Sequence, residues 1–230
     1  MRIDLHLGVH KTATTHLQRH WVQCAALPGA AACPPLQEVR TALTPVVYLR
    51  QPAARAEQSA ATATAWLVAW PARTGRLVLS EENLIGDCGQ LFERQALYPD
   101  ARARLERVAA LLPQAELRLW LCVREYGAFI RSAHSETLRH GPYRPFRAAY
   151  TGFDLVARGW PELVADVQAA FPGAPLHLWR YESLAGLRAQ ITATLFDLPP
   201  ERQPAPDDSR DRQSLSRMAV RLLDDLFQKA

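Results

Sequence analysis

The chain has 230 residues, of which 48% are hydrophobic and 22% charged, and its formal net charge is +4. This composition excludes an intrinsically disordered chain. The length suffices to bury one core and is too short for two ordinary domains, so we expect a single domain over residues 1–230. The N-terminus carries an acid where a signal peptide needs an apolar run, and no uncharged apolar stretch approaches about 18 residues. We therefore expect a cytoplasmic protein without a membrane span.

The cysteines and basic residues restrict the class of protein further. The four cysteines follow no metal-binding spacing, and a chain of this size does not depend on disulfides, so we expect free thiols. Of the 27 basic residues, only Lys11 and Lys229 are lysines. The arginines are scattered, without the clustered run or interleaved aromatic residues of a nucleic-acid binder, so we expect no nucleic-acid partner.

Periodicity and composition predict an alternation of strands and helices along the chain. The expected strands cover residues 3–8, 76–80, 117–123 and 176–180. The expected helices cover residues 14–22, 53–70, 101–112, 126–139, 155–171, a segment beginning near 184, and 215–227. Residues 199–214 are rich in Pro, Asp and Arg and are expected to form a mobile loop. This order predicts an α/β fold, a three-layer sandwich with a mostly parallel central sheet, as in P-loop NTPases.

The turn after the first strand carries the residues of a phosphate cradle. Ligands of open parallel sheets bind at the carboxyl ends of the strands, where residues 8–15 lie. A glycine turn followed by Lys11 and hydroxyl residues at a helix N-terminus offers main-chain N–H groups, a favourable helix dipole and an ammonium group. The match to a Walker A loop is imperfect, because His10 stands where the second glycine belongs. The alternative is an ordinary turn with a solvated lysine.

A second candidate anion site follows the strand over 117–123. Arg124 comes directly after this strand, and Ser132 lies about two helical turns further along. Both side chains can face one phosphate, because arginine offers a bidentate fork and serine an additional donor. The pair carries little weight by itself, since arginine and serine are common residues.

Together the two segments resemble the sulfotransferases that use 3′-phosphoadenosine-5′-phosphosulfate (PAPS), over residues 3 to about 190. Residues 6–18 follow the family's first loop, H-x-G-x-H-K-T-G-T-T-x-L-Q, except that Ala13 replaces a glycine. Because this replacement adds a methyl group, we expect Ala13 to have a negative φ. Residues 123–132 resemble the 3′-phosphate motif, with Glu-Tyr in place of acid-proline. Residues 78–84 and 180–184 resemble the bacterial members' Ser-Ser-Glu and Arg-Tyr-Glu-x-Leu segments.

The resemblance implies transfer of a sulfuryl group from PAPS to a hydroxyl or amine of a small molecule, such as a saccharide or metabolite, with no metal. It assigns Lys11 to the bridging oxygen and the 5′-phosphate, and Arg124 with Ser132 to the 3′-phosphate. The remaining residues of the donor cradle are then Gly8, His10, Thr12, Ala13, Thr14 and Thr15.

The acceptor must lose a proton, so a general base is required near the sulfur. Glu82 aligns with the family's strand-end glutamate and is our first candidate. Glu81 is the second, because adjacent residues of an ending strand point to opposite faces. His10 is the third and is also a candidate sulfonate ligand. The two acids have an alternative explanation, since acidic residues are favoured at any helix N-terminus.

Other interpretations stay open at this point. A P-loop kinase or NTPase would use residues 77–82 as a Walker B-like strand that holds Mg²⁺, but this strand end lacks an aspartate. A zinc site is not expected, because among the N-terminal histidines only His16 and His20 share a helical face.

The acceptor itself cannot be identified from the sequence. A cleft for an anionic sugar or peptide has two candidate linings, namely Arg102, Arg104 and Arg107, and residues 139–144. The alternative is that both sets form solvated faces. We expect His134 and His140 at the surface or in that cleft. The family's C-terminal Arg-Lys-Gly loop is absent, and Arg210, Arg212 and Ser214 are candidates to replace it.

Overall fold

The computed structural model describes residues 1–70, 75–112, 115–140, 143–205, 218–220 and 222. Within these residues, four parallel strands form one sheet in the order β2-β1-β3-β4. The strands are β1 (Arg2–His6), β2 (Arg76–Ser80), β3 (Glu116–Val123) and β4 (Leu176–Arg180). The predicted α/β fold with a parallel sheet is confirmed, because every pair of neighbouring strands is parallel. Parallel neighbours require long connections, and helices supply them here.

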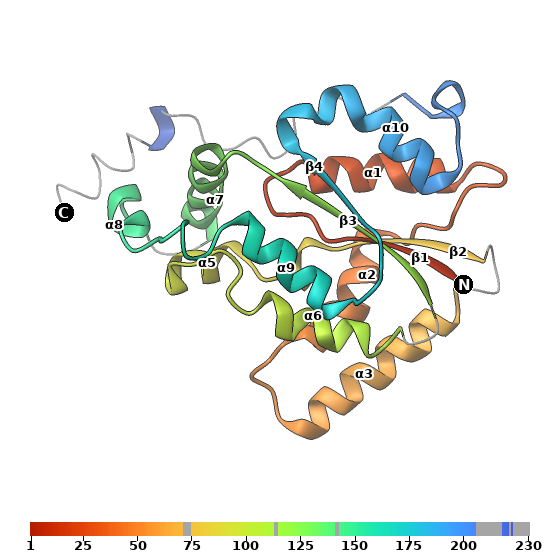
Figure 1. Ribbon diagram of the computed structural model, residues 1–230, viewed down its shortest axis with the longest axis horizontal. Helices are drawn as coiled ribbons and strands as arrows, with labels where there is room; N and C mark the ends of the chain where they lie inside the picture. The colour runs from red at the N-terminus through yellow and green to blue at the C-terminus, as the bar shows by residue number, and fades with distance from the viewer. Residues whose placement is uncertain (71–74, 113–114, 141–142, 206–217, 221, 223–230) are drawn as a thin grey trace.

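Helices cover both faces of the sheet and its carboxyl end (Figure 1). One face carries α1 (Thr14–Ala25) and α10 (Leu184–Phe196). The other carries α2 (Leu36–Leu43), α3 (Ala53–Val68), α6 (Ala101–Ala109) and α9 (Trp160–Ala170). Beyond the strand ends lie α5 (Cys88–Arg94), α7 (Tyr126–His140) and α8 (Phe146–Tyr150). Short 3₁₀ segments are η1 (Thr44–Val47), η2 (Glu82–Leu84), η3 (Tyr181–Ser183) and η4 (Pro200–Arg202).

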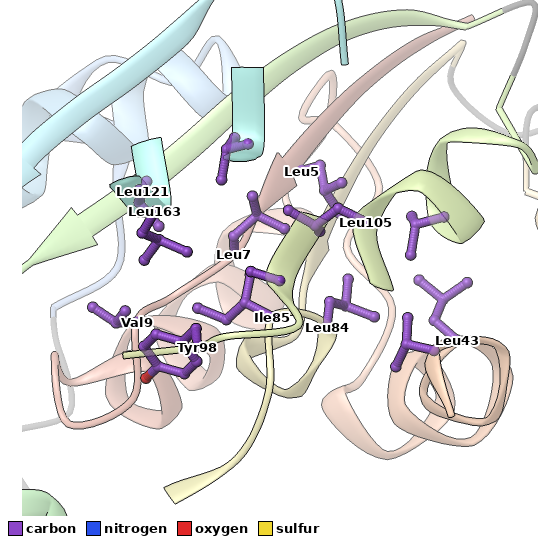
Figure 2. Packing of buried hydrophobic residues seen from close by; sticks show 14 of the residues in the cluster. Leu5, Leu7, Val9, Leu43, Leu84, Ile85, Tyr98, Leu105, Leu121 and Leu163 are labelled. Carbon is purple, nitrogen blue, oxygen red and sulfur yellow. The ribbon is translucent and has the colours of Figure 1, made fainter. Parts of the chain in front are cut away.

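The alternation of β1 distributes its side chains between two cores. Leu5, Leu7 and Val9 point into the larger core, where Ile85 and Tyr98 also lie (Figure 2). All five side chains are at most 1% exposed. Because the loop after β1 starts from this fully buried row, its position relative to the sheet is fixed.

The opposite side of β1 faces a smaller, aromatic core under α1 and α10. The His6 ring lies edge-on to Trp21, with 5.0 Å between ring centroids, and stacks on Trp179 at 5.7 Å. Trp120 and Trp179 are buried in this cluster, as expected from their positions in strands. Complete burial lowers the pKa of His6 to about 3, so its imidazole is neutral in the folded protein.

Several predicted boundaries differ from the structure. The helix expected over 155–171 begins only at Trp160, because Pro161 stands in its first turn, the one place where a helix tolerates proline well. Helices α2, α5 and α8 were not predicted, since each has eight residues or fewer. The segment expected as a loop over 199–214 begins with the 3₁₀ turn η4, and residues 206–217 lie outside the described residues, as does most of the helix expected over 215–227.

Two further features bear on the class of protein. In the part of the chain that the structure describes, no helix is both long and apolar enough to cross a membrane. The four cysteines, Cys24, Cys33, Cys88 and Cys122, carry free thiols, and burial raises the pKa of each.

Candidate active site

Hydrogen bonding to β3 continues beyond His6, the last residue of β1. The N–H group of Val9 donates to the carbonyl of Cys122 at 2.9 Å, and the N–H of Cys122 donates to the carbonyl of Gly8 at 2.6 Å. Pairing with β3 therefore continues to Val9. The next residue begins a tight turn that ends at Thr14, the first residue of α1.

This turn presents a row of main-chain N–H groups without acceptors. Lys11 and Ala13 have φ values of 63° and 62°, so two left-handed residues are separated by a single position. Such alternation makes a concave nest of N–H groups that binds anions. No acceptor within the described part of the chain takes the N–H groups of residues 11–15. The nest opens at the N-terminus of the 12-residue helix α1, where the dipole also favours an anion.

The conformation of Ala13 corrects one expectation from the sequence. We expected a negative φ there, and the structure has a left-handed residue at the N-cap of α1. An alanine in this conformation brings its Cβ close to the following carbonyl oxygen, which costs about 1–2 kcal/mol. The loop therefore keeps the shape that a glycine would allow, at a cost to the free energy of folding.

The loop threonines differ in what their hydroxyl groups do. Thr12 and Thr14 both donate to the carbonyl of Val9, Thr12 at 2.5 Å and Thr14 at 3.2 Å. Both side chains are buried, and they hold the turn closed. The hydroxyl of Thr15 has no hydrogen bond to any described residue and is half-buried on the first turn of α1. Of the three hydroxyls, that of Thr15 is thus open to a ligand.

The Lys11 ammonium group extends from the loop toward α7. Its Nζ donates to Oε2 of Glu136 at 3.0 Å, in an ion pair with side-chain exposures of 15% and 27%. Ser132 lies one turn before Glu136 on the same helix and is buried. Positions four apart share one helix face, so the face of α7 that carries Ser132 looks toward the lysine loop.

Arg124 contacts the lysine loop directly. Its Nη1 donates to the carbonyl of Lys11 at 2.7 Å, and its guanidinium lies 4.4 Å above the ring of Tyr181. The Trp160 indole N–H fixes the main chain of Arg124 by donating to its carbonyl at 2.8 Å. The Nε of Arg124 is buried and has no partner among the described residues. The two candidate anion sites predicted separately are therefore adjacent, and the Arg124 guanidinium keeps N–H groups that no described residue accepts.

The residues around Arg124 also explain two of the sequence patterns. The carboxylate of Glu125 accepts from the N–H groups of Gly127 and Ala128 at the start of α7, and these bonds lower the pKa of Glu125. Its own N–H donates to Glu182 at 2.9 Å. Glu125, the acid of the Glu-Tyr dipeptide, thus caps α7. Tyr181, in the Arg-Tyr-Glu segment, supplies the ring on which the Arg124 guanidinium lies.

Gly8 brings the end of β2 against the lysine loop. It has a φ of 86°, and a Cβ added to it would lie 2.9 Å from Cβ of Glu82. A glycine is therefore required here for two reasons, the left-handed backbone and the close approach. Glu82 is half-buried, and its carboxylate has no hydrogen bond or ion pair with any residue that the structure describes.

Glu81 points in a different direction from its neighbour. It is fully buried, and Arg40 donates to both of its carboxylate oxygens, Nε to Oε2 at 2.9 Å and Nη2 to Oε1 at 3.2 Å. Oε1 also accepts from the N–H of Asn83 at 2.9 Å. Glu81 is thus held in a bidentate ion pair and does not face the cavity beside Glu82.

Both ring nitrogens of His10 are engaged. Nε2 lies 3.1 Å from Oδ1 of Asn83, and Nδ1 lies 3.0 Å from the hydroxyl of Tyr98. An amide oxygen only accepts, so the Nε2 proton is assigned to this bond and the Tyr98 hydroxyl donates to Nδ1. The Tyr98 oxygen in turn accepts from the His10 N–H at 3.3 Å. His10 therefore anchors the loop, with neither nitrogen free.

A cavity of about 530 Å³ opens beside these residues. Its walls come from the lysine loop, α2, the end of β2, α5 and α7. The lining residues are His10, Arg40, Glu82, Asn83, Asp87, Cys88, Gly89, Glu93, Glu136 and Thr137. Two further cavities of about 290 and 480 Å³ share lining residues with it and lie along η1 and α5. The volume is typical of a small-molecule site.

The arginines expected near an acceptor behave differently from one another. Arg102 forms an exposed pair with Glu106, and Arg107 donates to the carbonyl of Tyr48 at 2.8 Å. Arg104 is buried, donates to the Asn83 carbonyl at 2.7 Å and lines the two smaller cavities. None of the three lines the cavity beside Glu82.

The expectation for His134 requires a correction. His134 is not at the surface, since it is 2% exposed and packs edge-on between Phe92 and Phe146. Its Nε2 pairs with the Arg144 carbonyl at 2.7 Å, so it joins α7 to the segment before α8. Among the described residues, no group of three His, Cys, Asp or Glu side chains is arranged to hold a metal.

Sequence reasoning missed several residues that build this site. Glu136 had a usable signal, because it lies four residues after Ser132 on a predicted helix. Tyr98, Asn83 and Arg40 had none, since their partners are 88, 73 and 41 residues away in the sequence. Each acts on the loop or on the end of β2 through long-range packing alone.

One comparison with a known structure supports the fold. The crystal structure of a sulfotransferase from Alicyclobacillus acidocaldarius superposes with a TM-score of 0.52 at 13% identity, over 100% of this chain and 92% of that one. The chain folds like a sulfotransferase. The sulfotransferase domain of the curacin biosynthetic pathway matches 95% of this chain and 82% of its own, with 14% identity and a TM-score of 0.45. No family model and no curated protein sequence matches the chain.

Proposed function

We propose that this protein is a PAPS-dependent sulfotransferase, which moves a sulfuryl group from PAPS to a small-molecule acceptor. The observation that carries the proposal is the contact between Arg124 and the Lys11 carbonyl, at 2.7 Å. This contact supports two anion sites side by side at the ends of neighbouring strands, an arrangement that suits a nucleotide with separate 3′- and 5′-phosphates. The sulfotransferase-like fold supports the same assignment.

The donor half of the site consists of residues 8–15 with Arg124 and Ser132. We assign the 5′-phosphate to the N–H nest and to the hydroxyl of Thr15. Lys11 leaves Glu136 and binds the oxygen that bridges phosphorus and sulfur, where negative charge grows as the bond breaks. The 3′-phosphate takes the guanidinium of Arg124 and the hydroxyl of Ser132. In this assignment Thr12, Thr14, Gly8, His10 and Ala13 shape the loop.

The acceptor half is the cavity beside Glu82. We assign Glu82 as the general base. Of the three candidates, Glu81 is paired with Arg40 and both ring nitrogens of His10 are hydrogen-bonded, whereas the Glu82 carboxylate has no hydrogen bond or ion pair with a described residue. An acceptor hydroxyl oxygen attacks sulfur in line, and its proton passes to the Glu82 carboxylate. The bond between sulfur and the bridging oxygen breaks, and adenosine-3′,5′-bisphosphate leaves with the electron pair beside Lys11.

The kinase alternative requires an open carboxylate at the end of β2 for Mg²⁺. Arg40 donates to both oxygens of Glu81, which disfavours that role for Glu81, whereas the Glu82 carboxylate stays open. A requirement for Mg²⁺ therefore separates the two functions. The 3′-phosphate preference distinguishes the two functions, since a kinase has no use for it.

Isothermal titration calorimetry tests the proposal with adenosine-3′,5′-bisphosphate, ADP and AMP, each with and without Mg²⁺. We expect the bisphosphate to bind at least about tenfold more tightly than AMP without metal, which corresponds to about 1.4 kcal/mol. Arg124→Ala should abolish this preference, because it removes the 3′-phosphate fork. Arg55→Ala, an exposed arginine on α3, is the control and should leave it unchanged. Equal affinities, or binding that depends on Mg²⁺, would contradict the assignment.

A further inference from the structure

We infer that the acceptor carries a protonated amino group beside the hydroxyl that is sulfated, as in an amino sugar or amino alcohol. This inference rests on the proposed function and names the substrate class of its acceptor half. It comes from the charges around the cavity of about 530 Å³. Four carboxylates line this cavity, those of Glu82, Asp87, Glu93 and Glu136, against the single guanidinium of Arg40.

The positive charge at the cavity is already compensated. Arg40 is committed to Glu81 by two hydrogen bonds. Lys11, the neighbouring cation, is paired with Glu136 at 3.0 Å and belongs to the donor half. Neither cation is available to an anionic acceptor once the donor is bound. Glu136 also pairs with Arg139, at 3.6 Å, so the charge left at the cavity walls is that of the remaining lining carboxylates, and it is negative.

Two of the carboxylates lack partners of their own. Glu82 and Glu93 form no hydrogen bond or ion pair with any residue in the described ranges. Glu93 is exposed at the end of α5, whereas Glu82 is half-buried next to Gly8. Asp87 accepts one bond, from the N–H of Gln90 at 2.9 Å. Carboxylates on more than one wall thus surround a space large enough for a small molecule, and they favour a cation over an anion.

The same charges decide which acceptor atom reacts. Nearby carboxylates favour the charged form of an amine and raise its pKa, so the bound amine keeps its proton. An ammonium nitrogen has no lone pair and does not attack sulfur. The attacking atom is then a hydroxyl oxygen, which transfers its proton to Glu82 as the sulfur–oxygen bond of the donor breaks. The product is an O-sulfate that retains a free ammonium group.

Three sugars that share one ring and differ in charge test this inference. Glucosamine, glucose and glucuronate are titrated into protein saturated with adenosine-3′,5′-bisphosphate, and sulfate transfer from PAPS is followed by mass spectrometry. We expect glucosamine to bind at least about fivefold more tightly than glucose and glucuronate to bind more weakly than glucose, since one partly exposed ion pair contributes up to about 1 kcal/mol. The expected product is an O-sulfate.

Glu93→Gln separates charge recognition from catalysis, because Glu93 has no part in the proposed chemistry. It should reduce glucosamine affinity by up to about fivefold and leave glucose affinity unchanged. Glu57→Gln is the matched control on α3, an exposed glutamate outside the cavity, and should change neither.

The two proposals fail in different ways. Adenosine-3′,5′-bisphosphate that does not bind overturns the sulfotransferase assignment and the inference with it. If the bisphosphate binds but glucuronate or glucose binds as tightly as glucosamine, or no sugar binds, or the product is an N-sulfate, only the acceptor inference is overturned.

Discussion

The two halves of the proposed site are built in opposite ways. The donor half uses a continuous loop, residues 8–15, with five main-chain N–H groups that have no acceptor in the described structure, together with the cations Lys11 and Arg124. The acceptor half is assembled from separate elements and lined by four carboxylates. One half attracts phosphates and the other repels them. A nucleotide therefore has one favourable orientation, with its sulfonate at the boundary between the halves.

In the proposed function, this contrast separates the two substrates within one pocket, without a wall between them. Gly8 and Glu82 touch at the boundary, and the pair of Lys11 with Glu136 crosses it. Until a donor binds, Glu136 neutralises the lysine. Once a phosphate takes the lysine, Glu136 keeps its ion pair with Arg139, at 3.6 Å.

The largest expected effect comes from Gly8→Ala, which alters the boundary itself. The new Cβ would lie 2.9 Å from Cβ of Glu82, so the strand end must move away from the loop. We expect kcat to fall by about 100-fold or more, because a displacement of about 1 Å has that cost in other enzymes.

Gly29→Ala is the matched control for this substitution. Gly29 has nearly the same φ, 82°, but nothing lies within 4 Å of an added Cβ. It should lower the free energy of unfolding through backbone strain alone and leave kcat unchanged. Equal kcat values for the two variants would show that the contact between Gly8 and Glu82 does not position the base.

A smaller effect is expected from Glu136→Gln, which removes the link between the halves. The donor then no longer competes with a carboxylate for Lys11. We expect calorimetry to show an affinity for adenosine-3′,5′-bisphosphate that is higher by up to about fivefold, the range of a partly exposed ion pair. Glu106→Gln, which breaks an exposed pair with Arg102, is the control. An unchanged or reduced affinity would show that Lys11 does not exchange Glu136 for the donor.

The smallest effect concerns the shape of the donor loop. Ala13→Gly relieves a left-handed alanine at a φ of 62°. It should raise the free energy of unfolding by about 0.5–1 kcal/mol, after allowance for the greater freedom of glycine in the unfolded chain. Urea unfolding measures this change. Ala26→Gly, at the other end of α1 with a φ of −76°, should instead lower stability.

The sequence predicted the strands well because each is a short apolar run whose pattern is local. Residues 76–80 and 176–180 match β2 and β4 at both ends. The predicted helix bounds were less accurate where one residue decides where a helix begins, as Pro161 does for α9. The conformation of Ala13 could not be predicted, because its φ is imposed by the bonds of Thr12 and Thr14 to Val9 and by the start of α1.

The sequence by itself determined the α/β architecture, the lysine loop and the arginine after the third strand, because these depend on local periodicity and on residues adjacent in the chain. Only the tertiary structure decided which carboxylate faces the cavity, that His10 and Glu81 are engaged elsewhere, and that the acceptor half is acidic. Those properties depend on contacts such as Arg40 with Glu81 and Lys11 with Glu136, between residues 41 and 125 positions apart. Contacts between residues so far apart in the sequence produce no local sequence pattern, since the packing of whole helices and strands brings the partners together.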